Sequence, residues 1–435
     1  MDVKSFNSKA IDSNFEIVKI REIIEKPPQY WANERAIDWN PNIDYRYIRI
    51  TDIDDYWNLK EDERKTAEKI ENKYIVNEND LLFARSWATA WKCYFVTKNI
   101  KWIFAWYMIR FVLNHKKCIS KYLFYITFTN FYKKRVEKIS RAAAQPNINS
   151  QEYLDFEFPL PPLEIQQEII DKIDSALAEK KNLENKSDEI LNSIDDYVLS
   201  ELWIELTEEK EENNYFIVDI EDIKDWRIDV FYNKPEFKKI EKQFLKSNNV
   251  VELKDIIDYV KTWTTPDTKK EPFSNEWIPF LRNTNLQKNE IITDELKYIK
   301  DEYKNTLTYS EKDDILICIA WTIGVSSVNN FWKIAINQNV SSLKIKQWIS
   351  PYFISYLLNT KIFSEFFDRV SSVATIKYIN NDNLLSIKIP LPPIEIQDKI
   401  ANEVKSRIKK ADELKKQANE IYEQTKNGVE KMILE

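Results

Sequence analysis

Few side chains in this sequence have the types and spacing that enzymatic chemistry requires. A single histidine, His115, leaves almost no room for paired-histidine acid–base catalysis or a histidine-rich metal site. The three cysteines, Cys93, Cys118 and Cys318, lie too far apart for a CxxC metal motif or a disulfide framework. Their spacing favours a reducing, cytoplasmic compartment.

Motifs for nucleotide binding are also missing. With 2 glycines among 435 residues, neither GxGxxG nor GxxxxGK[ST] can be written. The segment TPDTKKE (265–271) resembles the acidic cluster of a nuclease only superficially. A binding loop without catalytic function is therefore a better interpretation of this segment than a nuclease site. The residue types therefore favour binding over catalysis.

The distribution of charge indicates what could be bound. The net charge is −7, but residues 81–150 carry 13 basic side chains and one acidic side chain, and residues 315–379 carry 6 basic and 2 acidic ones. The acid is concentrated in 159–214, with 16 acidic and 5 basic side chains. Basic segments of this kind are typical of phosphate binding, although KKRVEK (133–138) alone could equally be a solvated helix surface.

Polar side chains suited to DNA recognition lie within these basic segments and also in other parts of each half of the chain. Arginine can bind guanine or a phosphate, lysine neutralises phosphates, and amides and hydroxyls can bond to base edges or the backbone. The predicted DNA-binding residues are Arg49, Arg85, Lys92, Lys133, Lys134, Arg135, Arg141, Gln145, Asn147, Thr264, Thr265, Arg282, Asn283, Asn285, Lys333 and Lys377.

An internal repeat predicts the elements that position these residues. PLPPLEIQ begins at Pro159 and PLPPIEIQ begins at Pro390, 231 residues later. YIRITDI, which contains Arg49, corresponds to FLRNTNL, which contains Arg282, and DLLFARSW corresponds to DILICIAW. The chain therefore consists of two similar halves.

Each proline motif leads into a predicted long amphipathic helix. Neither proline nor glycine interrupts 163–205, and the apolar side chains recur mostly four or seven residues apart. Two helices with matching apolar stripes favour an antiparallel coiled coil over two separate surface helices. The predicted stripe residues are Ile165, Ile169, Ile173, Leu177, Leu183, Ile190 and Val198, with Ile396, Ile400, Val404, Ile408, Leu414, Ile421 and Val429.

The predicted fold class is α+β with a pseudo-two-fold internal repeat. Short β-branched and aromatic runs such as KCYFVT and SSLKIK predict a curved, mostly antiparallel sheet with some helix in each globular part. The predicted boundaries are a globular domain at 1–158, a helix at 159–214, a second domain at 215–389 and a second helix at 390–435. No run of about 18 apolar residues is present, and the N-terminus lacks the apolar core of a signal peptide.

Together these features resemble the specificity subunit of type I restriction–modification systems. PLPPLEIQ, DLLFARS, the AQPNI segment and TWTTPDTKK are typical of that family, and the resemblance covers the whole chain. It implies that each globular part is a target recognition domain for one half of a bipartite, asymmetric DNA site. It also implies that the helices form a spacer between the half-sites.

The resemblance implies partners for this chain rather than catalysis by it. Two adenine-N6 methyltransferase subunits would bind S-adenosylmethionine, and endonuclease–translocase subunits would bind ATP and Mg²⁺, while this chain binds no cofactor. Its Pro-Pro pairs read KPPQ, LPPL and LPPI, which differ from the [DNS]PP[YF] loop of an adenine methyltransferase. The alternatives are a specificity-like subunit of another phage-defence methyltransferase complex and a coiled-coil scaffold that binds no DNA.

The 14 tryptophans form a separate anomaly. Trp31, Trp263, Trp87, Trp91 and Trp321 fall in loops where the family carries glycine. An indole at a turn with positive φ would clash with its own backbone. The hypothesis is that the source reads UGA as glycine and that these codons were translated as tryptophan. The alternative is a tryptophan-rich protein that stacks on bases.

Overall fold

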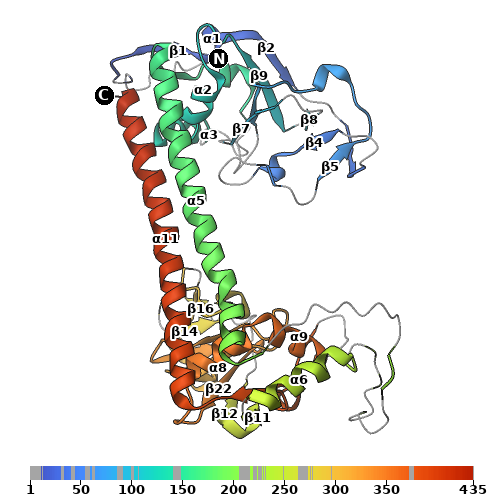
Figure 1. Cartoon of the computed structure of the whole chain (residues 1–435). Helices are drawn as coiled ribbons and strands as arrows, with labels where there is room; N and C mark the ends of the chain where they lie inside the picture. The colour runs from blue at the N-terminus through green and yellow to red at the C-terminus, as the bar shows by residue number, and fades with distance from the viewer. Residues whose placement is uncertain are drawn as a thin grey trace. The chain divides into compact units, whose positions relative to one another are not determined.

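The computed structural model describes most of the chain. The described residues are 11, 13–30, 34–40, 45–53, 59–60, 64–85, 92–98, 102–105, 107–140, 148–204, 216–218, 223, 228, 230, 232–247, 249–262, 273–274, 276, 278–294, 296–371 and 377–434. They form two compact units, unit 1 (Met1–Glu184 with Lys415–Glu435) and unit 2 (Asn185–Leu414) (Figure 1). No described helix has the length and apolar character needed to span a bilayer.

Unit 1 contains a four-stranded antiparallel sheet in the order β2-β9-β6-β7, together with the pairs β1-β10, β3-β5 and the parallel β4-β8. Its strands are β1 (Glu16–Lys19), β2 (Ile24–Tyr30), β3 (Ala36–Asp38), β4 (Arg46–Ile48), β5 (Lys65–Ala67), β6 (Leu81–Ala84), β7 (Cys93–Phe95), β8 (Trp102–Phe104), β9 (Met108–Leu113) and β10 (Glu157–Leu160). Its helices are α1 (Ile20–Ile23), α2 (Ser120–Ile126), α3 (Asn130–Ser140), α4 (Ser150–Leu154), the first part of α5 (Leu163–Glu201) and the last part of α11 (Ile394–Leu434).

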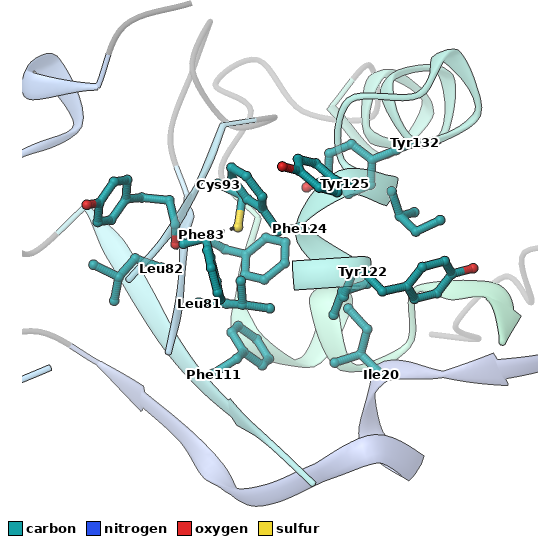
Figure 2. Packing of buried hydrophobic residues seen from close by; sticks show 14 of the residues in the cluster. Ile20, Leu81, Leu82, Phe83, Cys93, Phe111, Tyr122, Phe124, Tyr125 and Tyr132 are labelled. Atoms are coloured by element: carbon teal, nitrogen blue, oxygen red, sulfur yellow. Dashed lines mark hydrogen bonds between the residues drawn. The ribbon is translucent and has the colours of Figure 1, made fainter. Parts of the chain in front are cut away.

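The core of unit 1 lies between this sheet and the helices that follow it. All four residues of β6, LLFA, are buried, which is the pattern of a strand covered on both faces. Phe83 of β6 packs edge-on against Phe111 of β9, with ring centroids 5.2 Å apart. Figure 2 shows Tyr122 and Phe124 of α2 in the same cluster, together with Cys93. Burial raises the pKa of the Cys93 thiol, so this cysteine acts as a small core residue.

Unit 2 repeats the arrangement with additional strands. Its four-stranded sheet has the order β12-β22-β19-β20, and a five-stranded sheet has the order β13-β17-β14-β21-β18. The strands are β11 (Asn249–Glu252), β12 (Ile257–Lys261), β13 (Phe273–Ser274), β14 (Ile278–Leu281), β15 (Leu286–Gln287), β16 (Glu290–Ile291), β17 (Lys297–Ile299), β18 (Tyr309–Glu311), β19 (Ile315–Cys318), β20 (Ser326–Val328), β21 (Lys333–Ile336), β22 (Val340–Ile345) and β23 (Lys388–Leu391). The helices are the last part of α5, α6 (Pro235–Ser247), α7 (Leu253–Ile256), α8 (Pro351–Leu358), α9 (Lys361–Val370), α10 (Asn381–Leu385) and the first part of α11.

The proline motifs form the junction between each globular part and its long helix. The prolines of β10 and β23 lie in antiparallel pairs with β1 and β11. Just beyond them, the Gln166 side chain accepts from the Ile119 N–H (2.8 Å) and donates to the Pro161 carbonyl (2.8 Å). Gln397 accepts from the Ser350 N–H (3.0 Å) and donates to the Pro392 carbonyl (2.8 Å). The glutamine of PLPPxEIQ therefore fixes the start of each helix to its own domain.

The long helices pack against each other within each unit. In unit 1, the first part of α5 lies beside the last part of α11 (Figure 1). Ile169 and Ile173 of α5 share a core there with Tyr422 and Val429 of α11. In unit 2, Val198 of α5 shares a core with residues of α11 that include Ile400 and Val404.

Of the predicted stripe residues, Ile169, Ile173, Val198, Ile400, Val404 and Val429 are buried. Ile165, Leu177, Leu183, Ile190, Ile396, Ile408, Leu414 and Ile421 are half-buried. Ser187 was not predicted, although it is fully buried and its hydroxyl donates to the Ala411 carbonyl at 3.0 Å. Small residues at this point allow the two helices to approach closely.

The end of α5 has the hydrogen bonds of a Schellman motif. The Trp203 N–H bonds to the Ser200 carbonyl (3.0 Å), and the Ile204 N–H bonds to the Leu199 carbonyl (2.9 Å). Trp203 therefore holds the position that usually carries glycine, and its φ is 58°. Its indole is 78% exposed, so it gains little from packing.

Replacing Trp203 by glycine should therefore stabilise unit 2. We expect the free energy of unfolding to rise by about 1 kcal/mol because the left-handed strain is removed. Trp348→Gly is the matched control, because Trp348 is exposed but is not among the described residues with positive φ. Urea unfolding followed by circular dichroism measures both, and an equal response of the two variants would contradict this interpretation.

Candidate nucleic-acid interface

The basic run on α3 does not form one continuous charged surface. Lys134 is exposed, whereas Lys133 and Arg135 are half-buried. Burial lowers the pKa of Lys133, nearby Lys426 lowers it further, and Glu423 opposes the shift. Lys133 therefore lies near charged residues of α11.

Arg135 is engaged within its own domain. Its guanidinium bonds to Glu157 at 3.1 Å and lies over the rings of Phe131 and Phe156, 5.4 and 5.7 Å from their centroids. The aromatic residues interleaved with the basic run thus hold Arg135 against the core. Lys134 is the residue of this triplet that the fold presents to solvent.

The N-terminus of α3 is capped by a carboxylate from α11. Glu430 accepts from the N–H groups of Asn130 and Phe131, each at 3.0 Å. The Tyr132 N–H bonds to the hydroxyl of Thr129 at 3.2 Å. A negative charge at this end of a helix also complements the helix dipole. These bonds fix the orientation of the helix that carries Lys134.

The second repeat uses the same arrangement at α9. Asp195 of α5 accepts from the Lys361 N–H at 2.8 Å. Thr360 precedes α9 as Thr129 precedes α3, and each hydroxyl bonds to the carbonyl three residues earlier. In each unit, the globular part is therefore held by a carboxylate from the long helix of the opposite repeat.

Arg49 and Arg282 occupy equivalent turns with different partners. Arg49 bonds through Nε and Nη2 to the Asp52 carboxylate at 2.9 and 2.6 Å. Arg282 bonds through Nε to the amide oxygen of Asn285 at 3.3 Å. The first turn thus pairs a cation with an anion, and the second pairs a cation with a neutral amide. The two repeats share a backbone turn but differ in its electrostatics.

Arg85 stacks on an aromatic residue that the sequence analysis missed. Its guanidinium lies 5.3 Å from the centroid of Tyr30. The Tyr30 hydroxyl donates to the Ser150 hydroxyl at 2.8 Å and accepts from the Ser150 N–H at 3.1 Å. A guanidinium stacked in this way has its orientation fixed, as recognition of a base edge or phosphate requires. The only sequence signal for Tyr30 was its place next to the KPPQ segment.

Other predicted residues are divided between the interior and the surface. Lys92 is buried, and its ammonium group donates to the Ile53 carbonyl at 3.1 Å. Asn285 is also buried, and its amide donates to the Ile292 carbonyl at 3.4 Å. The burial of both argues against direct DNA contact, because their polar groups are used inside the fold.

The remaining candidates described by the structure lie nearer to solvent. Lys333 is exposed and lies 4.3 Å from the Tyr309 ring centroid. Lys377 is exposed and pairs with Asp368 at 2.8 Å, and half-buried Asn283 accepts from Asn339 at 3.5 Å. The residues Arg141, Gln145, Asn147, Thr264 and Thr265 lie outside the described residues.

Comparisons with known proteins give one consistent family. The family model for the type I restriction modification DNA specificity domain matches residues 12–192 and 246–423, one region in each repeat. The type I restriction enzyme MjaVIII specificity subunit of Methanocaldococcus jannaschii is 24% identical over 446 residues, which cover 99% of this chain and 94% of that protein. The putative MjaX specificity subunit of the same organism is 27% identical over 331 residues, which cover 74% of this chain and 68% of that protein.

A solved structure also shares the fold. It comes from work on complex assembly and conformational transition of the type I R-M system, and it aligns with a TM-score of 0.53 at 16% identity over 96% of both chains.

Lys134 and Arg135 should respond differently to neutralisation. Arg135→Gln should lower the free energy of unfolding by about 1 kcal/mol, because it removes a half-buried ion pair and two cation–π contacts. Lys134→Gln should leave stability nearly unchanged. If Lys134 contacts a phosphate, that change should reduce the salt slope of duplex binding by about 1. Unfolding curves measure the stability of both variants, and a salt titration measures their DNA binding. A loss of stability in Lys134→Gln but not in Arg135→Gln would contradict the observed contacts.

Proposed function

The chain belongs to the type I restriction–modification DNA specificity family, and on that premise we propose that it reads a bipartite, asymmetric DNA site, one half-site per globular domain. In this proposal it also holds adenine-N6 methyltransferase and endonuclease–translocase subunits around that site. It contributes DNA recognition and assembly, and it contributes no catalytic residue.

The observation that carries the proposal is a repeated domain with altered side chains. Both repeats have the same four-stranded sheet order and a parallel strand pair just before the Arg49 or Arg282 turn. Arg85 on Tyr30 belongs to the first repeat, whereas the corresponding residue of the second repeat is Ile319. Two similar scaffolds with different polar side chains are suited to reading two different half-sites.

In this proposal the long helices act as a spacer packed as an antiparallel coiled coil. The side-by-side packing within each unit supports this, as do the Ser187–Ala411 bond and the 2.9 Å bond from Arg407 to the Ser193 hydroxyl. A helical spacer would fix the number of bases between the half-sites, as protein geometry does in other DNA readers.

The proposed partners carry the chemistry. S-adenosylmethionine would bind to the methyltransferase subunits, and ATP and Mg²⁺ would bind to the endonuclease–translocase subunits. The proposed DNA contacts on this chain are the less buried members of the candidate set, including Lys134, Arg85, Arg282, Lys333 and Lys377.

The proposal is tested by selecting bound duplexes from a random library with the purified complex of this chain and its methyltransferase. We expect two short blocks of defined bases separated by a fixed gap. Arg85→Ala should reduce the preference for the defined bases in one block, and Arg282→Ala should do the same in the other block. Each loss of base discrimination should be about 10-fold to 100-fold. Lys416→Ala, at an exposed position on α11, is the matched control. A single contiguous block, or loss in the same block for both arginines, would contradict the proposal.

We further propose that many of the tryptophan positions are UGA codons that the source reads as glycine. Trp203 and Trp321 have φ of 58° and 69°, in the region that glycine favours. Trp332 and Trp348 are also exposed, which is unusual for so large an apolar side chain. Trp102 is different, because it is half-buried and its ring packs at a tilt against Tyr94, with ring centroids 6.2 Å apart.

Peptide mapping of the protein isolated from its own source tests this assignment. Mass spectrometry should find glycine at 203 and 321. Tryptophan at both positions, encoded by UGG, would contradict it.

A further inference from the structure

The Arg49 and Arg282 turns have nearly the same backbone. Arg49 precedes a 3-10 turn that ends at Asp52 and has φ −106° and ψ 157°. Arg282 precedes a 3-10 turn that ends at Asn285 and has φ −110° and ψ 161°. The side chain that ends each turn accepts from the backbone N–H of the arginine, at 2.9 Å for Asp52 and 3.2 Å for Asn285. A difference between the two turns must therefore come from their side chains.

An aspartate and an asparagine hold an arginine differently at this position. One oxygen of Asp52 accepts from the backbone N–H, and the other accepts from Nε and Nη2 of Arg49 at 2.9 and 2.6 Å. Asn285 has a single acceptor oxygen, which takes both the backbone N–H and Nε of Arg282, the latter at 3.3 Å. Two charge-assisted bonds orient a guanidinium more firmly than one longer bond to a neutral amide.

Both of these residues lie inside the fold. Asp52 is 5% exposed and Asn285 is 2% exposed, whereas Arg49 and Arg282 are half-buried. A DNA molecule could therefore reach the arginines more readily than the residues beneath them. An effect of Asp52 or Asn285 on recognition would have to pass through its arginine.

A second exchange accompanies the first, at the start of the strand that follows the β6 or β19 loop. The Lys92 carbonyl accepts from the Ala84 N–H at 3.0 Å, and the Val325 carbonyl accepts from the Cys318 N–H at 2.8 Å. Ala84 ends β6 and Cys318 ends β19, which are the corresponding strands of the two sheets. Lys92 and Val325 therefore occupy equivalent positions.

These two residues lie next to the arginine turns. The Lys92 ammonium group donates to the carbonyl of Ile53, the residue that follows the aspartate of the first turn. Val325 is partly buried in the cluster that contains Leu286, the residue that follows the asparagine of the second turn. The second repeat thus replaces one carboxylate and one ammonium group by an amide and a valine. The formal charge of the two sets is equal, so the exchange changes how the arginine is held and leaves the net charge unaltered.

We propose that Asp52 and Asn285 are positioning residues that determine how Arg49 and Arg282 contact DNA. Asp52 holds the guanidinium of Arg49 in one orientation, which favours discrimination between base edges. Asn285 holds Arg282 less firmly and adds no negative charge beside it, which favours affinity for many sequences over discrimination. The inference rests on the proposed function, because it requires that each repeat reads its own half-site.

The test uses the complex of the full chain with its methyltransferase and duplexes that carry single base changes in either block. Asp52→Asn should lower discrimination about 10-fold in the block that Arg85→Ala also affects, because Arg49 loses its two-donor contact. The other block should be unchanged. In an Arg49→Ala background, Asp52→Asn should cause no further loss of discrimination, because Asp52 acts through Arg49.

A double variant separates positioning from folding. Asp52→Asn combined with Lys92→Val copies the second repeat, so it should have a higher melting temperature than Asp52→Asn alone but the same loss of discrimination. Asp38→Asn is the matched control, because it removes a carboxylate that is 95% exposed in the same repeat and pairs with Lys65 at 2.6 Å. It should leave discrimination in both blocks unchanged.

Asn285→Asp is the reciprocal variant, and it tests the proposal even if Asp52→Asn does not fold. It should raise discrimination about 5-fold in the block that depends on Arg282 and lower affinity for unrelated duplexes. No change in that block, or a loss of discrimination there, would contradict the role of Asn285.

The proposal is overturned if Asp52→Asn changes neither block or weakens both equally. It is also overturned if the losses from Asp52→Asn and Arg49→Ala add, or if Lys92→Val restores discrimination together with stability. A wild-type complex without a two-block preference would overturn the proposed function and this inference with it. A two-block preference that Asp52→Asn leaves intact would overturn this inference alone.

Discussion

The structure depends on the fact that neither long helix can bury its own apolar stripe. Both α5 and α11 carry an apolar stripe along one face, so each needs an apolar partner surface to be stable as a long helix. In unit 1 that surface joins Ile173 to Val429, and in unit 2 it joins Val198 to Val404. Each repeat is therefore completed by the helix of the other.

The same constraint determines how the globular parts are held. The buried side chains of Gln166 and Gln397 fix the start of each helix to its own domain through hydrogen bonds. Glu430 and Asp195 then bind α3 and α9 from the opposite helix. Each globular part is thus bonded to both long helices within its unit, which limits its freedom to rotate. A fixed orientation is what a domain that reads a half-site would need.

The sequence predicted the architecture better than the interface. The repeat, the proline-led helices and most of the apolar stripe follow from local periodicity, which does not depend on tertiary packing. The direction of a charged side chain does depend on tertiary packing. The sequence therefore predicted that all three residues of the KKR run face DNA, although Arg135 packs on Phe131 and Phe156. Lys92 and Asn285 were predicted to contact DNA because a single sequence does not show that a polar side chain is buried. Tyr30 was not predicted because it carries no charge.

In the proposed function, the two repeats read two different half-sites at a fixed separation. Sequencing the methylated bases in a host that carries this chain and its methyltransferase tests it most directly. We expect N6-methyladenine within one asymmetric motif made of two short blocks and a constant gap. A palindromic motif, a contiguous motif or a gap of variable length would contradict it.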